Sequence, residues 1–210
     1  MLEGFRAALH YEKPVTVEGI SLIAAALHVK IKETHVLASG RVYGNEHYKQ
    51  AALSIALARK LGNVSLGIRS IVYRDAIKGY SSQNSIRVGV SSMLKLTKEV
   101  SIYLQATNIG WASHTPQSTH ALVIDGGLMY DASDMVNVSI GWRKQRESPP
   151  VGHFHVVYIP ADKITVGAGY LTNINGMYLS VGYPLKAIKL SVSIRYDPVL
   201  GCMPGLMLFN

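Results

Sequence analysis

The stretch Val136-Asn-Val-Ser-Ile-Gly-Trp142 alternates large apolar residues with small or polar ones. Successive side chains of a strand point to opposite faces, so this stretch predicts a strand with one apolar face and one lean, polar face. The same rhythm recurs in Ile164-Thr-Val-Gly-Ala-Gly-Tyr170 and in Ile188-Lys-Leu-Ser-Val-Ser-Ile-Arg-Tyr196. It recurs again at residues 64–68, 86–90 and 100–104. A chain built almost wholly from such strands predicts an all-β barrel.

About fourteen strands are expected along the chain. They are placed at residues 6–11, 21–31, 35–43, 49–59, 64–74, 85–96, 100–108, 121–130, 136–143, 153–159, 164–170, 177–183, 188–196 and 203–209. Residues 51–61 are the best helix candidate by propensity, but Leu53, Ile55 and Leu57 alternate with small residues, which favours a strand.

The connections between these segments fall into two classes. Tight turns are expected at residues 61–63, 97–99, 132–134, 160–163 and 184–187, and longer loops at 75–84, 110–120, 145–152, 171–176 and 197–201. Short turns at one end and longer loops at the other predict an up-and-down antiparallel β-barrel. The prediction is a single domain over residues 1–210, in which residues 1–19 form an N-terminal tail and the first strand.

The composition of the chain bears on which classes of function are expected. Only 16% of the 210 residues are charged, which is low for a soluble domain, and the net charge is +8. The basic residues are scattered and accompany no known nucleic-acid motif, so no nucleic-acid partner is expected. Cys202 is the sole cysteine, which excludes an internal disulfide. No signal peptide is visible, which counts against an exported protein.

The apolar face could point outward to lipid or inward to a core. Several expected strands reach the 9–11 residues that cross a bilayer, and tyrosines in or beside strands predict an interfacial girdle. These tyrosines are Tyr73, Tyr103, Tyr130, Tyr158, Tyr170, Tyr178, Tyr183 and Tyr196. An inward apolar face would require a flattened or plugged barrel, because fourteen strands enclose more space than side chains fill. Both arrangements stay open at this point.

Six segments occur in an order that resembles a known family. They are Ala58-Arg-Lys-Leu-Gly-Asn-Val-Ser-Leu-Gly-Ile68, the loop with Tyr80, Leu96-Thr-Lys-Glu-Val-Ser-Ile102, Asn108-Ile-Gly110, Ile159-Pro-Ala-Asp-Lys-Ile-Thr-Val-Gly-Ala-Gly169 and Tyr196-Asp-Pro-Val-Leu-Gly201. Their order is similar to that of the PorV/PorQ-like barrels of Bacteroidota, relatives of the fourteen-stranded fatty-acid transport barrels. The likeness runs roughly from residue 5 to residue 210.

This resemblance implies a non-enzymatic subunit of the type IX protein secretion translocon, at the outer membrane or its periplasmic face. The partner would be a large outer-membrane translocon protein, with lipid or detergent at the barrel exterior. The short chain favours a compact subunit that plugs the periplasmic side of the channel. The alternative is a small outer-membrane transport barrel for hydrophobic or anionic solutes. No cofactor and no small-molecule substrate are evident.

Two residue patterns resemble parts of a metal site and of a hydrolase active site, but each lacks a required element. His153-Phe-His155 puts two imidazoles on one strand face, but a third metal ligand would have to come from loops (His114, His120 or Glu147), so no metal site is predicted. Ser118, His120 and Asp125 could suggest a hydrolase, but no Gly-x-Ser-x-Gly elbow is present, so no enzyme is predicted.

Five basic residues fall on the lean face of their strands: Arg69, Arg87, Arg143, Lys189 and Arg195. In a closed barrel with an outward apolar face, they would lie inside. One interpretation is an ordinary lumen network of paired charges and water. The other is an anion-favouring pore or a seat for an acidic segment of a partner.

Overall fold

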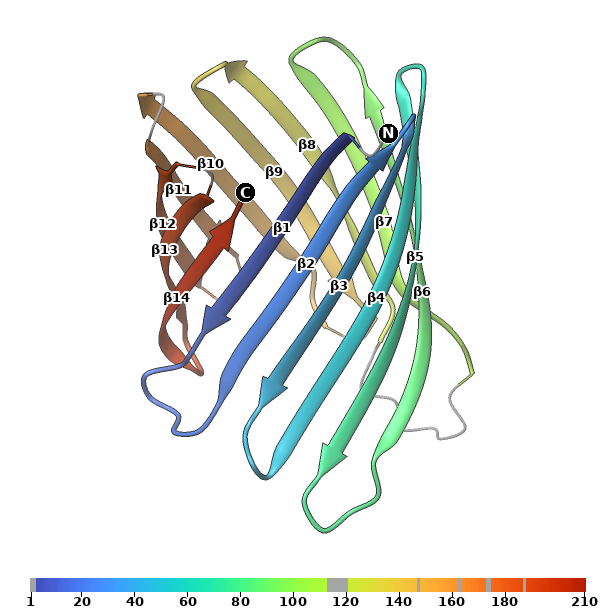
Figure 1. Cartoon of the computed structure of the whole chain (residues 1–210), viewed down its shortest axis with the longest axis vertical. Coiled ribbons are helices and arrows are strands. Elements are labelled where there is room, and N and C mark those ends of the chain that lie inside the picture. Colours follow the sequence, from blue (N-terminus) through green and yellow to red (C-terminus); the bar gives the residue numbers. More distant parts are fainter. Residues whose placement is uncertain (1–2, 113–120, 147, 162–163, 173–174, 187) are drawn as a thin grey trace.

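The computed structural model of the chain describes residues 3–112, 121–146, 148–161, 164–172, 175–186 and 188–210. Fourteen strands form one closed antiparallel barrel, in which each strand pairs with its neighbours in the chain and β14 pairs with β1 (Figure 1). The strands are β1 (Glu3–Glu12), β2 (Ser21–Ile31), β3 (Thr34–Gly44), β4 (Tyr48–Leu61), β5 (Val64–Ile77), β6 (Gln83–Lys95), β7 (Val100–Ala112), β8 (Val123–Ser133), β9 (Val136–Gln145), β10 (Val151–Ala161), β11 (Ile164–Leu171), β12 (Gly176–Leu185), β13 (Ile188–Asp197) and β14 (Gly201–Phe209).

The predicted strand count and the up-and-down order are confirmed. Residues 51–61 lie in β4, so the strand interpretation of the helix candidate is also correct. The described part of the chain contains no helix that is long and apolar enough to cross a membrane.

The two ends of the barrel differ in the length of their connections. At the upper end of Figure 1, the connections whose residues are all described span at most four residues: 32–33, 62–63, 96–99 and 134–135. At the lower end, the fully described connections span three to eight residues: 13–20, 45–47, 78–82 and 198–200. The predicted asymmetry between short turns and longer loops is therefore present.

Strand β7 runs further than expected because a bulge redirects it. The prediction ended this strand at Asn108, but the ladder with β6 shifts register there and continues to Ala112. Asn108 has a φ of 59°, a left-handed conformation that asparagine tolerates better than most residues. Its side chain accepts a hydrogen bond from the Tyr73 hydroxyl at 3.1 Å and donates one to the Ala121 carbonyl at 3.2 Å. The Asn108-Ile-Gly110 motif is thus a β-bulge that places a polar group in the lumen.

The apolar face points outward. Leu53, Ile55, Ile140, Leu179 and Val181 lie near the middle of their strands and expose 53–68% of their surface. Apart from Pro14 and glycines, the buried apolar residues in the described part of the chain are Ala52, Ile71, Tyr73 and Met203, so the barrel wall encloses no hydrophobic core. An outward apolar band around a polar interior is the arrangement of outer-membrane barrels, in which lipid replaces the missing core.

The tyrosine girdle was partly misassigned. Tyr130, Tyr158 and Tyr183 point outward near the short-turn end, and Tyr170 and Tyr196 point outward near the longer loops. Tyr73, Tyr103 and Tyr178 instead belong to the lumen-facing set of their strands. They contact Asn108, His153 and His155 respectively. Each of these tyrosines lies one position away from the residues that point outward in its strand. Because side chains alternate between the two faces, a difference of one position puts the side chain on the lumen side of the wall.

Candidate functional site

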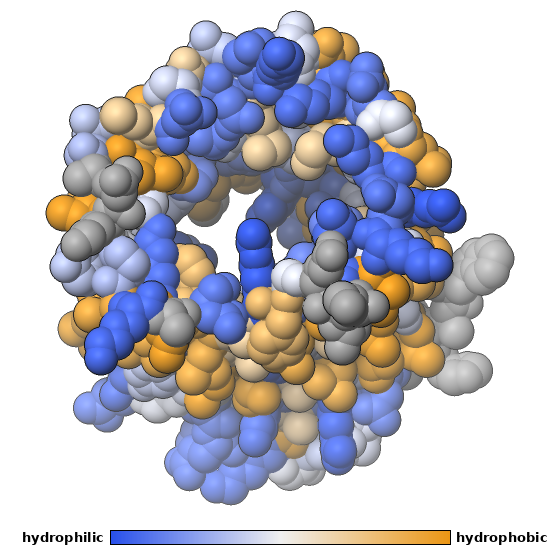
Figure 2. Space-filling model, turned by 45° about the horizontal axis from the view of Figure 1, so that its top comes forward, coloured by the Kyte–Doolittle hydropathy of each residue, from blue (hydrophilic) through white to orange (hydrophobic). Residues whose placement is uncertain are grey.

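A cavity of about 640 Å³ lies in the lumen. Its walls come from strands on both sides of the barrel, because β1–β5, β7–β9 and β14 all contribute lining residues. Figure 2 shows the molecule hollowed at its centre, with hydrophilic side chains around the opening. The lumen is therefore the candidate functional site.

Small side chains on three neighbouring strands leave room for this cavity. Ala24, Ala26, Ala52, Ser39 and Ser54 occupy inward positions of β2, β3 and β4 and line the space. Ala24, Ala26, Ala52 and Ser54 each lie one residue away from a large outward apolar side chain, as the alternation of a strand requires. Because these inward residues are short, longer polar side chains from neighbouring strands extend into the free volume.

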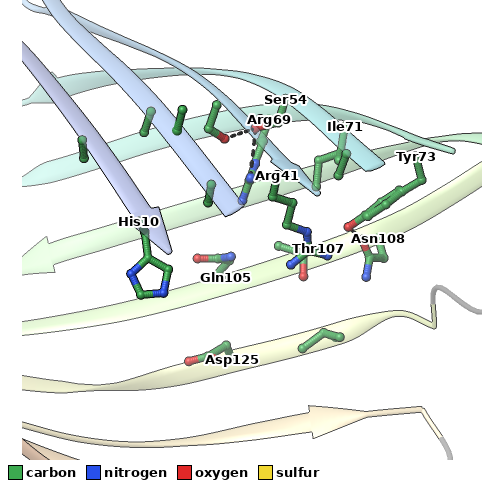
Figure 3. A pocket seen from close by; sticks show the side chains of 18 of the residues that line it. His10, Arg41, Ser54, Arg69, Ile71, Tyr73, Gln105, Thr107, Asn108 and Asp125 are labelled. Carbon is green, nitrogen blue, oxygen red and sulfur yellow. Dashed lines mark hydrogen bonds between the residues drawn. The ribbon is translucent and has the colours of Figure 1, made fainter. Parts of the chain in front are cut away.

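Two arginines dominate one wall of the cavity. Arg41 on β3 and Arg69 on β5 extend toward the same space in Figure 3. The Arg69 Nη2 donates to Ser54 Oγ at 2.9 Å, and Ser54 Oγ lies 2.7 Å from Ser39 Oγ. The Arg41 guanidinium lies 5.9 Å from the centre of the Tyr73 ring, which is a cation–π distance. Neutral partners therefore orient both guanidinium groups, and no carboxylate of the described residues lies within ion-pair distance of either.

An acid lies across the cavity on β8. Asp125 is 8% exposed, and its carboxylate accepts a hydrogen bond from Arg143 Nε at 2.8 Å. His153 Nε2 lies 3.4 Å from the other carboxylate oxygen and 3.2 Å from the Tyr103 hydroxyl. Gly127 and Gly141 make room for Tyr103, since a Cβ at either position would come within 3 Å of its hydroxyl. This side of the lumen is thus a closed polar network around one carboxylate.

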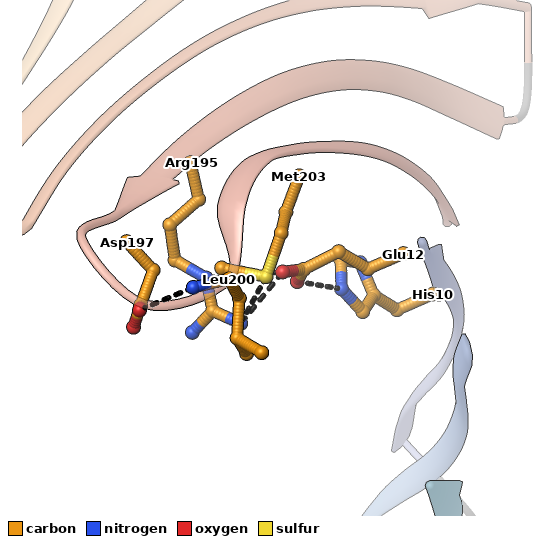
Figure 4. Close-up of polar contacts among 6 residues, drawn as sticks. All are labelled: His10, Glu12, Arg195, Asp197, Leu200 and Met203. Carbon is orange, nitrogen blue, oxygen red and sulfur yellow. Dashed lines mark hydrogen bonds and ion pairs between the residues drawn. The ribbon is translucent and has the colours of Figure 1, made fainter. Parts of the chain in front are cut away.

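A second network bridges the seam where the barrel closes (Figure 4). Glu12 on β1 is 8% exposed, and its Oε1 accepts hydrogen bonds from Arg195 Nε at 3.0 Å and Nη2 at 2.6 Å. His10 Nε2 lies 3.2 Å from the other carboxylate oxygen. Arg195 belongs to β13, so the contact crosses β14 on the lumen side, where Met203 also touches the guanidinium. The first and last parts of the chain are thereby joined by side chains as well as by the backbone ladder.

The five predicted basic residues divide into two groups. Arg143 and Arg195 pair with carboxylates, as just described. Arg69 donates to Ser54, and Lys189 donates to Thr165 Oγ1 with its ammonium 5.5 Å from the Phe209 ring centre. Arg87 on β6 is 4% exposed, and its Nε and Nη2 have no hydrogen-bond partner among the described residues. Two of the five basic residues thus pair with carboxylates, and the other three have neutral partners or none among the described residues. The choice between a lumen charge network and an anion-favouring pore or a seat for an acidic segment stays a prediction.

In the described part of the chain, the metal and hydrolase patterns do not assemble a site. His153 contacts Asp125 and Tyr103, while the His155 ring lies 5.1 Å from the Tyr178 ring. Within the described residues, no group of three His, Cys, Asp or Glu side chains could hold a metal ion. Asp125 is engaged by Arg143 and His153. The proposed partners in the loops (His114, Ser118, His120 and Glu147) lie outside the described residues.

Sequence reasoning missed Arg41, His10 and Glu12. Arg41 lies in a strand whose inward set also contains Leu37, so alternation alone left its face ambiguous. Glu12 was assigned to a tail beyond the first strand. The signal that could have found it was the run His10-Tyr-Glu12, in which an outward aromatic residue separates two polar ones.

Together, the closed antiparallel barrel, the outward apolar band and the hollow polar lumen define an outer-membrane-type β-barrel. This agrees with the predicted location at the outer membrane. No family model and no curated protein matches the chain.

Solved structures do match its fold. A variant of Rhodopseudomonas blastica porin superposes with a TM-score of 0.58 at 8% identity, covering 100% of this chain and 99% of that one. A second variant of the same porin gives a TM-score of 0.54 at 8% identity with the same coverage. A chain described under "Asymmetric conductivity of engineered proteins" gives 0.52 at 10% identity, covering 100% of this chain and 98% of that one. The architecture is therefore similar to that of bacterial porins.

Proposed function

We propose that the protein is a small outer-membrane transport barrel that lets hydrophilic solutes cross through its lumen. The observation that carries this proposal is a polar cavity of about 640 Å³ inside a wall that is apolar on its outer surface. A hydrophobic solute would meet arginines, serines and amides there, so the lining favours small polar or charged solutes. The likeness to porins supports the same class of function.

Ion conductance tests the proposal. Purified protein inserted into planar lipid bilayers should produce discrete current steps in potassium chloride. Ala52 and Ala51 offer a matched pair, because Ala52 lines the cavity and Ala51 is its neighbour of opposite parity in β4. Ala52→Trp should lower the single-channel conductance severalfold by filling the lumen, while Ala51→Trp should leave it near the wild-type value. Bilayers that stay silent with folded wild-type protein would refute transport.

Association with a type IX secretion translocon stays a prediction. No feature of the described residues favours a plug over a free-standing barrel. Purification from native membranes, followed by mass spectrometry, separates the two. A much larger outer-membrane protein that co-purifies in stoichiometric amount would support the translocon subunit, and a barrel that always purifies without such a protein would exclude it.

A further inference from the structure

We infer that the lumen wall formed by β3, β5 and β6 holds a binding site for a small oxyanion, a carboxylate, phosphate or sulfate group. The inference rests on the proposed function and names a solute class for the same lumen. Its basis is a set of three arginines, Arg41, Arg69 and Arg87, which we call the arginine wall. Two of them line the cavity, and Arg87 lies beside Arg69's strand, opposite Ile71 in the ladder.

The arginine wall differs from the other lumen arginines in its partners. Arg143 and Arg195 lie 2.8 and 2.6 Å from carboxylate oxygens. Within the part of the chain that the structure describes, no carboxylate lies within ion-pair distance of Arg41, Arg69 or Arg87. Their hydrogen-bond partners are neutral: Gln50 for Arg41 and Ser54 for Arg69. Three positive charges therefore lie on this wall without a direct ion pair to a described carboxylate; Gln50, which accepts from Arg41, donates in turn to Asp75.

Burial strengthens this imbalance. Arg87 is 4% exposed, so its guanidinium has lost nearly all contact with bulk water, and its Nε and Nη2 have no hydrogen-bond partner among the described residues. The Nε of Arg69 is buried and likewise has no partner in the described part of the chain. A buried cation without a partner is costly, and an anion nearby recovers part of that cost through the Coulomb term. The lumen site thus contains donors and charge that an anion would satisfy.

The geometry favours an oxyanion over a halide. A guanidinium presents its N–H groups as a planar fork that matches two oxygens of a carboxylate or phosphate. Arg69 is oriented by Ser54, and Arg41 by the Tyr73 ring, so the forks are held rather than free. Gln105 and Thr107 on β7 line the same cavity and add neutral donors beside them (Figure 3). The carboxylate of Asp125 lies across the cavity, held by Arg143 and His153.

Inhibition of chloride current by inorganic phosphate tests the site. With wild-type protein in planar bilayers, phosphate should reduce the chloride current along a saturable curve. Replacing both cavity arginines, in Arg41→Gln/Arg69→Gln, should raise the half-blocking phosphate concentration by roughly tenfold or more, as expected for the loss of charge-assisted hydrogen bonds. The control is Arg59→Gln, which removes one positive charge from the outward parity of β4 and should leave the curve unchanged; the single variants Arg41→Gln and Arg69→Gln, which match it in charge, should each weaken the block.

A conservative variant separates a shaped site from a general positive field. Arg41→Lys/Arg69→Lys keeps both charges and removes the forks, so it should retain selectivity for chloride over potassium while phosphate block weakens. Unchanged phosphate block in this variant would overturn the oxyanion site and leave only a positive field.

Phosphate binding can also be measured by thermal unfolding, which requires no ion current. Phosphate should raise the unfolding temperature of detergent-solubilised wild-type protein along a saturable curve, and this rise should be absent in the glutamine double variant. A channel that conducts but shows neither block nor stabilisation refutes the site and spares the proposed function. Stabilisation without any conductance supports the site and refutes transport.

Discussion

Glu12 and Arg195 show how single residues secure this barrel. The carboxylate accepts two hydrogen bonds from one guanidinium, and the pair spans the seam between the two ends of the chain. The backbone ladder between β1 and β14 runs from Ala8 to Glu12. Two further hydrogen bonds extend it, from Lys13 N–H to the Pro204 carbonyl and from Val15 N–H to the Cys202 carbonyl. The ion pair therefore lies where the wall closes, and it should contribute to stability.

Glu12→Gln removes the charge of this pair and keeps the side-chain shape. We expect the free energy of unfolding to fall by about 1–3 kcal/mol, as for hydrogen bonds to charged groups. The value should lie near the low end because water reaches 47% of the Arg195 side chain. Urea unfolding in lipid vesicles, followed by tryptophan fluorescence, measures the change. Glu18→Gln, the same replacement at an exposed residue of the 13–20 loop, is the control. Equal effects of the two substitutions would contradict a stabilising pair.

At the scale of the strand, parity decides which substitutions are tolerated. Val181 and Ser180 are neighbours in the middle of β12, and Val181 is 53% exposed on the outer face. Ser180 faces the lumen, opposite Gly167 and Ser193 in the flanking strands. The two positions therefore meet lipid and lumen water at the same depth.

Val181→Arg should destabilise the barrel by about 2–4 kcal/mol, the cost of a charged side chain on the lipid face near the bilayer midplane. Ser180→Arg should cost much less, because Gly167 and Ser193 leave room and water solvates the charge. Folding titrations in urea with lipid vesicles compare the two variants. A larger cost at residue 180 than at residue 181 would reverse the assignment of the faces.

At the scale of the whole molecule, the unequal ends give the barrel an orientation. Outer-membrane barrels place their short turns on the periplasmic side and their longer loops outside. The 62–63 turn and the 78–82 loop lie at opposite ends of β5, at the top and the bottom of Figure 1. The longer loops should therefore face the exterior of the cell.

Epitope insertion tests this orientation. A tag inserted in the 78–82 loop should bind antibody on intact cells, while a tag in the 62–63 turn should bind only after the outer membrane is permeabilised. Both variants should migrate as folded barrels in mild detergent, which serves as the control for misfolding. Antibody binding to the 62–63 tag on intact cells, without binding to the 78–82 tag, would invert the barrel in the membrane.

The charged residues of the lumen show which features of the site the alternation of side chains predicts and which it does not. The sequence places Arg69, Arg87, Arg143, Lys189 and Arg195 on lean faces, but parity gives no partner for any of them. Arg143 forms an ion pair with Asp125, and Arg195 forms one with Glu12. Arg69 instead donates a hydrogen bond to Ser54. Arg41, which completes the arginine wall, was missed because Leu37 shares its face.

The sequence by itself determined the strands, their number and the meander, because alternation and turn residues act over neighbouring positions. The bulge at Asn108 was not predicted, since the expected strand ended at that residue. Only the tertiary structure decided which side chains meet across the lumen, since closure of the barrel joins Glu12 to Arg195 over 183 positions of the chain. The curvature of the barrel wall places Asp125 of β8 across the lumen from Arg41 of β3 and Arg69 of β5. No two-residue pattern in the sequence encodes that curvature.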